Sequence, residues 1–327
     1  MGHGNPNLRW QKVFQWNIGL DISVLDGRIS AAVDVYNKDT RDLLSRRDLQ
    51  ASTGFTSYTE NVGAINNKGV EAMLSAYLVR NLEKRIIWCI TGRMAYNKNT
   101  IVKLSDALKK DTQDALTKNI ELGTLLFEGD PTNAIYAVRS LGIDPSTGDE
   151  LYLTKDGKIT DTWKSSDRVF LGSYDPKYRG NVSSLFQWGG LTLNLAFGFY
   201  FGGYQYNSTL LSKVEIMRNM IAVGNVDKRV YADRWQKPGD VKFFKKIDDK
   251  STKATSRFVM KENVFELQNI SLQYAFDGPK LKEKAKIQSI ILGVNMSDIF
   301  HLSTIRQERG TGYPFARHAS MSLSLTF

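Results

Sequence analysis

Side chains capable of acid–base or nucleophilic chemistry are few and scattered in this sequence. Histidine occurs three times, as His3, His301 and His318, and none of them has a second histidine or a glutamate at metal-binding helical spacing. We expect His301 in a long loop and His318 at the start of the last strand, both solvated. The serines lack the Gly-x-Ser-x-Gly elbow of hydrolases. These residues favour neither an enzyme nor a cofactor.

Carboxylates are concentrated in one segment, Asp144–Glu150, with Asp156 and Asp161 close behind. Hard cations such as Ca²⁺ bind clustered oxygen ligands, but this spacing differs from the twelve-residue EF-hand loop. Tight turns at Asp144-Pro145 and Asp156-Gly157 explain the same residues. Calcium therefore stays an alternative to a turn-rich loop.

Alternation with a period of two residues is the dominant pattern, and it predicts strands. Between Phe14 and Val24 every even position is apolar, whereas the odd positions carry Gln, Asn, Gly, Asp and Ser. Similar runs predict about nine strands, with a weaker one at Asp42–Leu49; the firm ones cover residues 14–24, 29–36, 70–78, 86–94, 182–188, 191–202, 269–276, 289–296 and 318–327.

The predicted strands are joined alternately by short and long connections. Short turns include Asp26-Gly27 and Gly189-Gly190, while the long connections span residues 100–177, 204–263 and 297–317. Inside the first long connection, Leu104–Lys118 has helical spacing with Ser105 as N-cap. A small hairpin is expected around Asp156-Gly157.

The polar and apolar faces of these strands fit two environments. In a soluble sandwich the apolar face packs on a second sheet and strands are usually about 5 or 6 residues long. In an outer-membrane barrel the apolar face meets lipid, the polar face meets water, and each strand needs about 10 residues. The alternating runs span about 10 to 12 positions, with aromatic residues near their ends. The pattern favours the membrane barrel, while the large sandwich stays an alternative.

Composition limits the other classes of protein. The 327 residues carry a net charge of +10, which suits a soluble protein that binds polyanions, but Lys and Arg are scattered and we expect no nucleic acid. No run of 18 or more apolar residues predicts a helical span. The opening residues resemble no signal peptide. We therefore expect either that the protein is cytoplasmic or that Met1 is not a native N-terminus.

Several ordered motifs resemble the C-terminal part of the SusC/RagA family of TonB-dependent outer-membrane transporters. They run through nearly the whole chain; they are the segments 4–10 (GNPNLRW), 52–58 (STGFTSY), 61–63 (NVG), 67–71 (NKGVE), 136–147 (YAVRSLGIDPST), 227–235 (DKRVYADRW), 238–240 (PGD) and 255–258 (TSRF).

The resemblance implies an all-β, antiparallel transmembrane barrel of about 22 strands, of which residues 1–327 supply about the last ten, with long extracellular loops. The plug domain and the N-terminal barrel strands would be absent from this chain. It also implies a SusD-like lid lipoprotein, contact with the TonB complex only through the missing part, a location in the outer-membrane lipid, and an oligosaccharide or peptide ligand. A small self-contained barrel that acts on lipid is the alternative.

Aromatic residues on the long loops are the candidates for ligand contact, because their rings stack on apolar faces of sugars and peptides. These candidates are Tyr152, Trp163, Tyr231 and Trp235. Packing within the loops is an equally good explanation for them, and it stays open here.

The last residues, Leu323, Leu325 and Phe327, close an apolar alternation and are expected to act as the C-terminal signal for barrel assembly. We predict that Phe327→Asp impairs insertion, because a charge replaces the terminal aromatic ring on the lipid-facing side. Heat-modifiable migration of extracted membranes on gels checks this, with Phe327→Tyr as the control. Insertion of the Asp variant at the normal level would contradict it.

Overall fold

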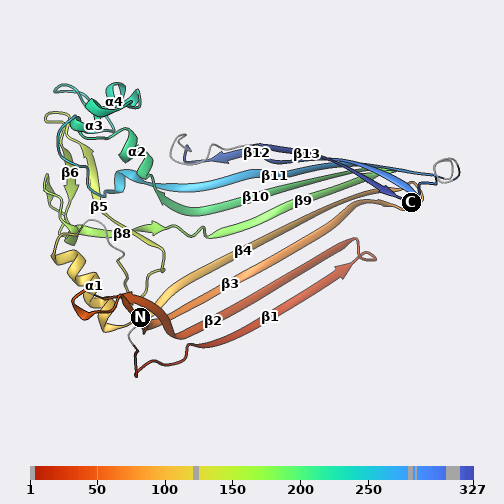
Figure 1. Ribbon diagram of the computed structural model, residues 1–327, viewed down its shortest axis with the longest axis horizontal. Coiled ribbons are helices and arrows are strands. Elements are labelled where there is room, and N and C mark those ends of the chain that lie inside the picture. The colour runs from red at the N-terminus through yellow and green to blue at the C-terminus, as the bar shows by residue number, and fades with distance from the viewer. Residues whose placement is uncertain (1–3, 50, 121–124, 279–282, 284–285, 307–316) are drawn as a thin grey trace.

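A broad antiparallel sheet dominates the computed structural model, which describes residues 4–49, 51–120, 125–278, 283, 286–306 and 317–327. The sheet has nine strands in the order β1-β2-β3-β4-β9-β10-β11-β12-β13 (Figure 1). Their bounds are β1 Lys12–Val24, β2 Ile29–Asp48, β3 Ser57–Asn81, β4 Ile86–Leu104, β9 Tyr178–Trp188, β10 Leu191–Tyr206, β11 Val259–Asp277, β12 Ser289–Ser303 and β13 His318–Thr326. Each of the nine predicted strands is confirmed, and Asp42–Leu49 proves to belong mostly to the end of β2.

The remaining elements lie beyond one end of the long strands (Figure 1). A second sheet has the order β7-β6-β5-β8, and short helices accompany it. These elements are β5 Ala134–Ile143, β6 Glu150–Leu153, β7 Ile159–Thr160, β8 Arg168–Ser173, α1 Asp106–Thr117, α2 Ser208–Lys213, α3 Arg218–Val223, α4 Arg229–Ala232, η1 Ala51–Thr53, η2 Ser165–Asp167 and η3 Ser256–Phe258.

The helix and the small hairpin predicted within the first long connection are both confirmed. The Ser105 hydroxyl accepts a hydrogen bond from the Leu108 N–H at 3.3 Å and so caps α1. The β6–β7 hairpin turns at Asp156-Gly157, where Gly157 has a φ of 79°. Among the described residues, no helix has the length and apolar character needed to span a membrane.

Register places residues of like polarity in rows across the wide sheet. One face carries the row Ile18, Val35, Val70, Tyr96, Tyr178 and Phe201, each paired directly with the next. The opposite face carries the row Gly19, Asp34, Glu71, Ala95, Arg179 and Tyr200. We name these the outer face and the lumenal face.

Much of the apolar band on the outer face is exposed. Ile18 is 69% and Leu74 is 55% exposed, and in the described part of the chain no second sheet or helix packs over these strands. The buried apolar clusters lie instead among the loops beyond the strands. The soluble sandwich is therefore wrong, because a sandwich must bury this face.

The height of the apolar band matches a bilayer. Strand β9 has 11 residues, and the steps between them, at about 3.3 Å each, span about 33 Å, or about 25 Å along the normal at a tilt of about 40°. Aromatic pairs mark both ends of β9: Tyr96 and Tyr178 lie 5.4 Å apart at one end, and Trp88 and Phe186 lie 6.5 Å apart towards the other. Aromatic girdles of this kind flank the lipid-facing band of outer-membrane barrels.

The sheet is open. Strands β1 and β13 each pair with a single neighbour among the described residues, β2 and β12 respectively. The small closed barrel considered above is therefore not formed by these strands. The C-terminus lies at the end with the short turns (Figure 1), whereas the small sheet and helices lie at the other end. Since barrels have short periplasmic turns and long extracellular loops, the small sheet is on the extracellular side.

One buried guanidinium joins the long loops. Arg257 donates to both oxygens of Glu150 at 2.8 and 2.7 Å, and to both oxygens of Glu215 at 2.6 and 2.7 Å. Its fifth N–H donates to the carbonyl of Phe243 at 2.7 Å. The three charged side chains are at most 6% exposed. Burial alone would lower the pKa of Arg257, but its hydrogen bonds to Glu215 and Glu150 raise it. All five donors are thus satisfied in a fixed fork.

A second buried arginine shapes the chain around this cluster. Arg234 is fully buried and donates to the carbonyls of Lys245 at 2.8 Å, Ile216 at 2.7 Å and Lys246 at 2.7 Å. Burial lowers the pKa of Arg234, yet carbonyl oxygens surround its charge. We call the structure held by Arg234 and Arg257, residues 134–173 and 207–258, the loop module.

We predict that Arg257→Met destabilises the loop module by about 3–5 kcal/mol, because it leaves two buried carboxylates without their partner. Hydrogen exchange of β5 and β6 measures the effect. The control is Arg218→Met, which removes an exposed ion pair to Asp249 with an N–O distance of 3.9 Å and should change little. Equal hydrogen-exchange protection of β5 and β6 in the two variants would show that the ion pairs of Arg257 do not hold the loop module together.

Candidate functional site

Charges of both signs gather on the lumenal face. Asp34 and Glu71 are direct cross-strand partners, and Arg179 lies two strands further along the same row. Together with Arg93 from the next row they line a shallow cavity of about 390 Å³. Carboxylates and guanidinium groups within one cavity can bind the ammonium and carboxylate groups of a zwitterionic ligand.

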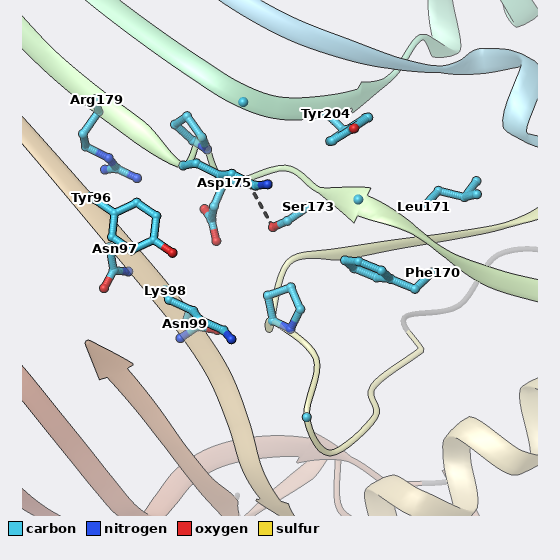
Figure 2. A pocket seen from close by; sticks show the side chains of 16 residues that line it. Tyr96, Asn97, Lys98, Asn99, Phe170, Leu171, Ser173, Asp175, Arg179 and Tyr204 are labelled. Atoms are coloured by element: carbon cyan, nitrogen blue, oxygen red, sulfur yellow. Dashed lines mark hydrogen bonds between the residues drawn. The ribbon is translucent and has the colours of Figure 1, made fainter. Parts of the chain in front are cut away.

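A second cavity, of about 440 Å³, lies within the wall of the sheet. Strand β9 begins at Tyr178, opposite Tyr96 of β4 and Phe201 of β10, so the later residues of β4 and β10 have no β9 between them. The segment before β9 fills part of this gap (Figure 2). We call the cavity the wall pocket; its lining includes Tyr96, Asn97, Lys98, Asn99, Pro131, Phe170, Asp175, Lys177, Arg179 and Tyr204.

Hydrogen bonds within the protein occupy the amides and the carboxylate of the wall pocket. Asn99 accepts from the N–H of Thr132 at 2.8 Å, and Asn97 accepts from the hydroxyl of Tyr36 at 3.0 Å. Asp175 accepts from the amide of Asn133 at 3.2 and 3.1 Å. The side chains left for a ligand are the aromatic rings and the cations Lys98, Lys177 and Arg179, so the pocket suits an anion.

The four loop aromatics proposed as ligand contacts occupy different environments. Tyr152 and Trp163 are 8% and 9% exposed and form one buried cluster with Val138. The Trp163 indole also donates to the Ala254 carbonyl at 3.0 Å. These two rings pack within the loop module, and ligand contact by them stays a prediction.

The other two candidates are more accessible. Tyr231 is 55% exposed. The Trp235 indole donates to the Pro145 carbonyl at 2.9 Å and packs on Gly148, so that ring fixes the turn as well. Ligand contact stays a prediction for Tyr231 and Trp235.

The structure also places two polar residues that the sequence singled out. His301 lies in β12 and not in a long loop, and its Nδ1 is 3.2 Å from Glu266 on the lumenal face, so that expectation was wrong. The Asp144 carboxylate accepts from Ser146 and Thr147, and these hydrogen bonds lower the pKa of Asp144. It therefore stabilises a turn. The described residues contain no group of three or more candidate metal ligands.

The residues that organise the loop module were not singled out from the sequence. Arg257 and Arg234 lie within the segments TSRF and DKRVYADRW, and Trp235 of the latter contacts Pro145 of a third segment. The short segments that carry the family resemblance thus meet in space. Asn61 does the same at the N-terminus, where it exchanges hydrogen bonds of 2.8 Å with the backbone of Arg9.

Comparison with known proteins agrees with this architecture. Among curated relatives, TonB-dependent receptor P39 of Formosa agariphila is 23% identical, over 91% of this chain and 32% of its own length. TonB-dependent receptor SusC of Bacteroides thetaiotaomicron is 35% identical over a shorter region, 31% of this chain and 10% of its own length. The chain thus spans about a third of the length of P39.

Solved structures share the fold. The RagAB peptide transporter superposes with a TM-score of 0.76 over 93% of this chain and 33% of its own, at 23% identity. Residues 2–233 match the family described as TonB dependent receptor-like, beta-barrel. Together with the exposed apolar band and the polar lumenal face, this match shows that the chain belongs to the TonB-dependent receptor β-barrel family of the outer membrane.

Proposed function

We propose that this chain forms the C-terminal part of the barrel of an outer-membrane nutrient importer, and that the plug domain and the first barrel strands come from the remaining two thirds that its relatives possess. The observation that carries the proposal is the two-faced sheet: lipid-facing side chains on one side and a charged, hydrated wall on the other. The open edges at β1 and β13 support it, because further strands must pair with them in lipid.

The ligand proposed is a small peptide or an oligosaccharide. Asp34, Glu71, Arg93 and Arg179 line the lumenal cavity, and this mixture of charges complements the ends and side chains of peptides better than uncharged sugars. RagAB, whose solved structure shares the fold, is a peptide transporter, which agrees with this preference. A glycan is the second candidate, supported by the exposed ring of Tyr231.

The partners follow from the same proposal. A SusD-like lid lipoprotein would close over the loop module, and the TonB complex would engage the part of the importer that precedes this chain. The loop module gives such a lid a rigid seat, because Arg257 ties two long loops together. No reaction chemistry is required of the protein, since its relatives are described as receptors and transporters.

Growth of cells that rely on this importer tests the proposal. We expect growth on a tryptic digest of casein as sole amino-acid source to require the gene and an energised TonB system, and growth on mixed plant oligosaccharides as sole carbon source not to require it. The opposite dependence would identify a glycan importer. Growth independent of the gene on both media would contradict nutrient import of either class.

The lumenal cavity has its own test. Asp34→Asn with Glu71→Gln should slow uptake of basic peptides severalfold, because both carboxylates face the lumen. Replacement of Lys84, in the short turn between β3 and β4, by Gln is the control. Equal uptake by the double variant and the control would exclude the cavity from the transport path.

A further inference from the structure

Over strands β2, β3 and β4 the outer face changes character abruptly one row above the aromatic girdle, whereas on β1 that row still carries Trp16. The row that contains Val70, Tyr96 and Tyr178 is apolar or aromatic, and the next extracellular row contains Asn37, Lys68 and Lys98. Lys68 and Lys98 are direct cross-strand partners, and both are exposed. Two like charges placed directly opposite each other destabilise a sheet unless an opposite charge lies between them.

The described part of the protein does not supply that opposite charge. Neither Lys68 nor Lys98 forms an ion pair or a side-chain hydrogen bond with the residues described. Two carboxylates share this region and both are otherwise engaged: Asp39 accepts from Asn66 at 2.6 Å and from Asn37 at 3.5 Å, and Asp175 accepts from Asn133. The row therefore presents a net positive charge at the level where the bilayer surface lies.

The wall pocket adjoins this positive surface at Lys98. Lys98 lines it from the outer face, whereas Lys177, which also lines it, precedes Tyr178 and so lies on the lumenal side with Arg179. The pocket has a volume of about 440 Å³, and it opens where β9 is absent between β4 and β10. Charged groups and an open volume thus adjoin an apolar band that ends in tyrosines.

We propose that Lys68 and Lys98 bind the phosphate groups of an anionic lipid of the outer leaflet, with the headgroup beside Lys98 at the mouth of the wall pocket and the acyl chains along Val70 and the band below it. Lysines just outside an apolar band attract lipid phosphates, and tyrosines prefer the level between acyl chains and headgroups. A soluble nutrient would use the charges but would leave the adjoining apolar band unused. The inference needs the outer-membrane location of the sheet and is independent of transport.

Native mass spectrometry of the full-length protein in detergent tests the site, with bisphosphorylated lipid A as the probe and zwitterionic phosphatidylcholine as the comparison. We expect one tightly held lipid A, and an apparent Kd about 30-fold higher for Lys68→Gln with Lys98→Gln. The Lys84→Gln variant, altered at the periplasmic end, should bind as the wild type does. Lys68→Arg with Lys98→Arg should retain binding, because it keeps both charges.

Three outcomes would overturn the proposal. The first is unchanged lipid A binding by the double Gln variant, with its heat-modifiable migration confirming that it is folded. The second is equal binding of phosphatidylcholine, which would show that charge is irrelevant. The third is displacement of the lipid by an equal concentration of inorganic phosphate or of an acidic peptide, which would identify a site for soluble anions. Loss of nutrient uptake with lipid binding intact would leave the site standing.

Discussion

Hydrocarbon cannot hydrogen-bond to a polypeptide, and this constraint governs the whole structure. Within the bilayer every backbone N–H and C=O must find its partner on a neighbouring strand. The inner strands of the sheet meet this requirement, since each pairs on both sides. The outer edges of β1 and β13 do not, and each unpaired group in lipid costs several kcal/mol. The described strands thus leave this requirement unmet at two edges.

The same constraint explains why the strands could be predicted and why their lengths could not. Inside the bilayer one face must be apolar, so residues alternate strictly and the pattern is visible along a single sequence. Above the bilayer both faces meet water, and the alternation stops. Strand β2 shows this: its regular apolar alternation ends at Val35, but pairing with β3 continues to Asp48 through Asn37 and Asp39. The point at which the alternation stops therefore indicates the membrane boundary and not the end of the strand.

Other parts of the candidate sites depend on contacts that no local pattern encodes. Arg257 and Glu150 are separated by 107 residues, and Lys68 meets Lys98 only through the register of β3 with β4. Tyr152 and Trp163, expected from the sequence as ligand contacts, are buried for a physical reason. Loops that stand far from the membrane need a hydrophobic centre of their own, and large rings provide most of its buried area. The motif segments had indicated the right regions but not this structural role.

Arg257 also imposes a sequence of events on biogenesis. Glu150 lies in the connection between β4 and β9, Glu215 and Arg257 lie in the connection between β10 and β11, and the β9–β10 hairpin separates the two. Before the second connection reaches the cell exterior, both carboxylates stay hydrated, since burying them without a cation is too costly. The small sheet consequently closes late, after the hairpin beneath it has crossed the bilayer. Its maturation depends on translocation of a single distant residue.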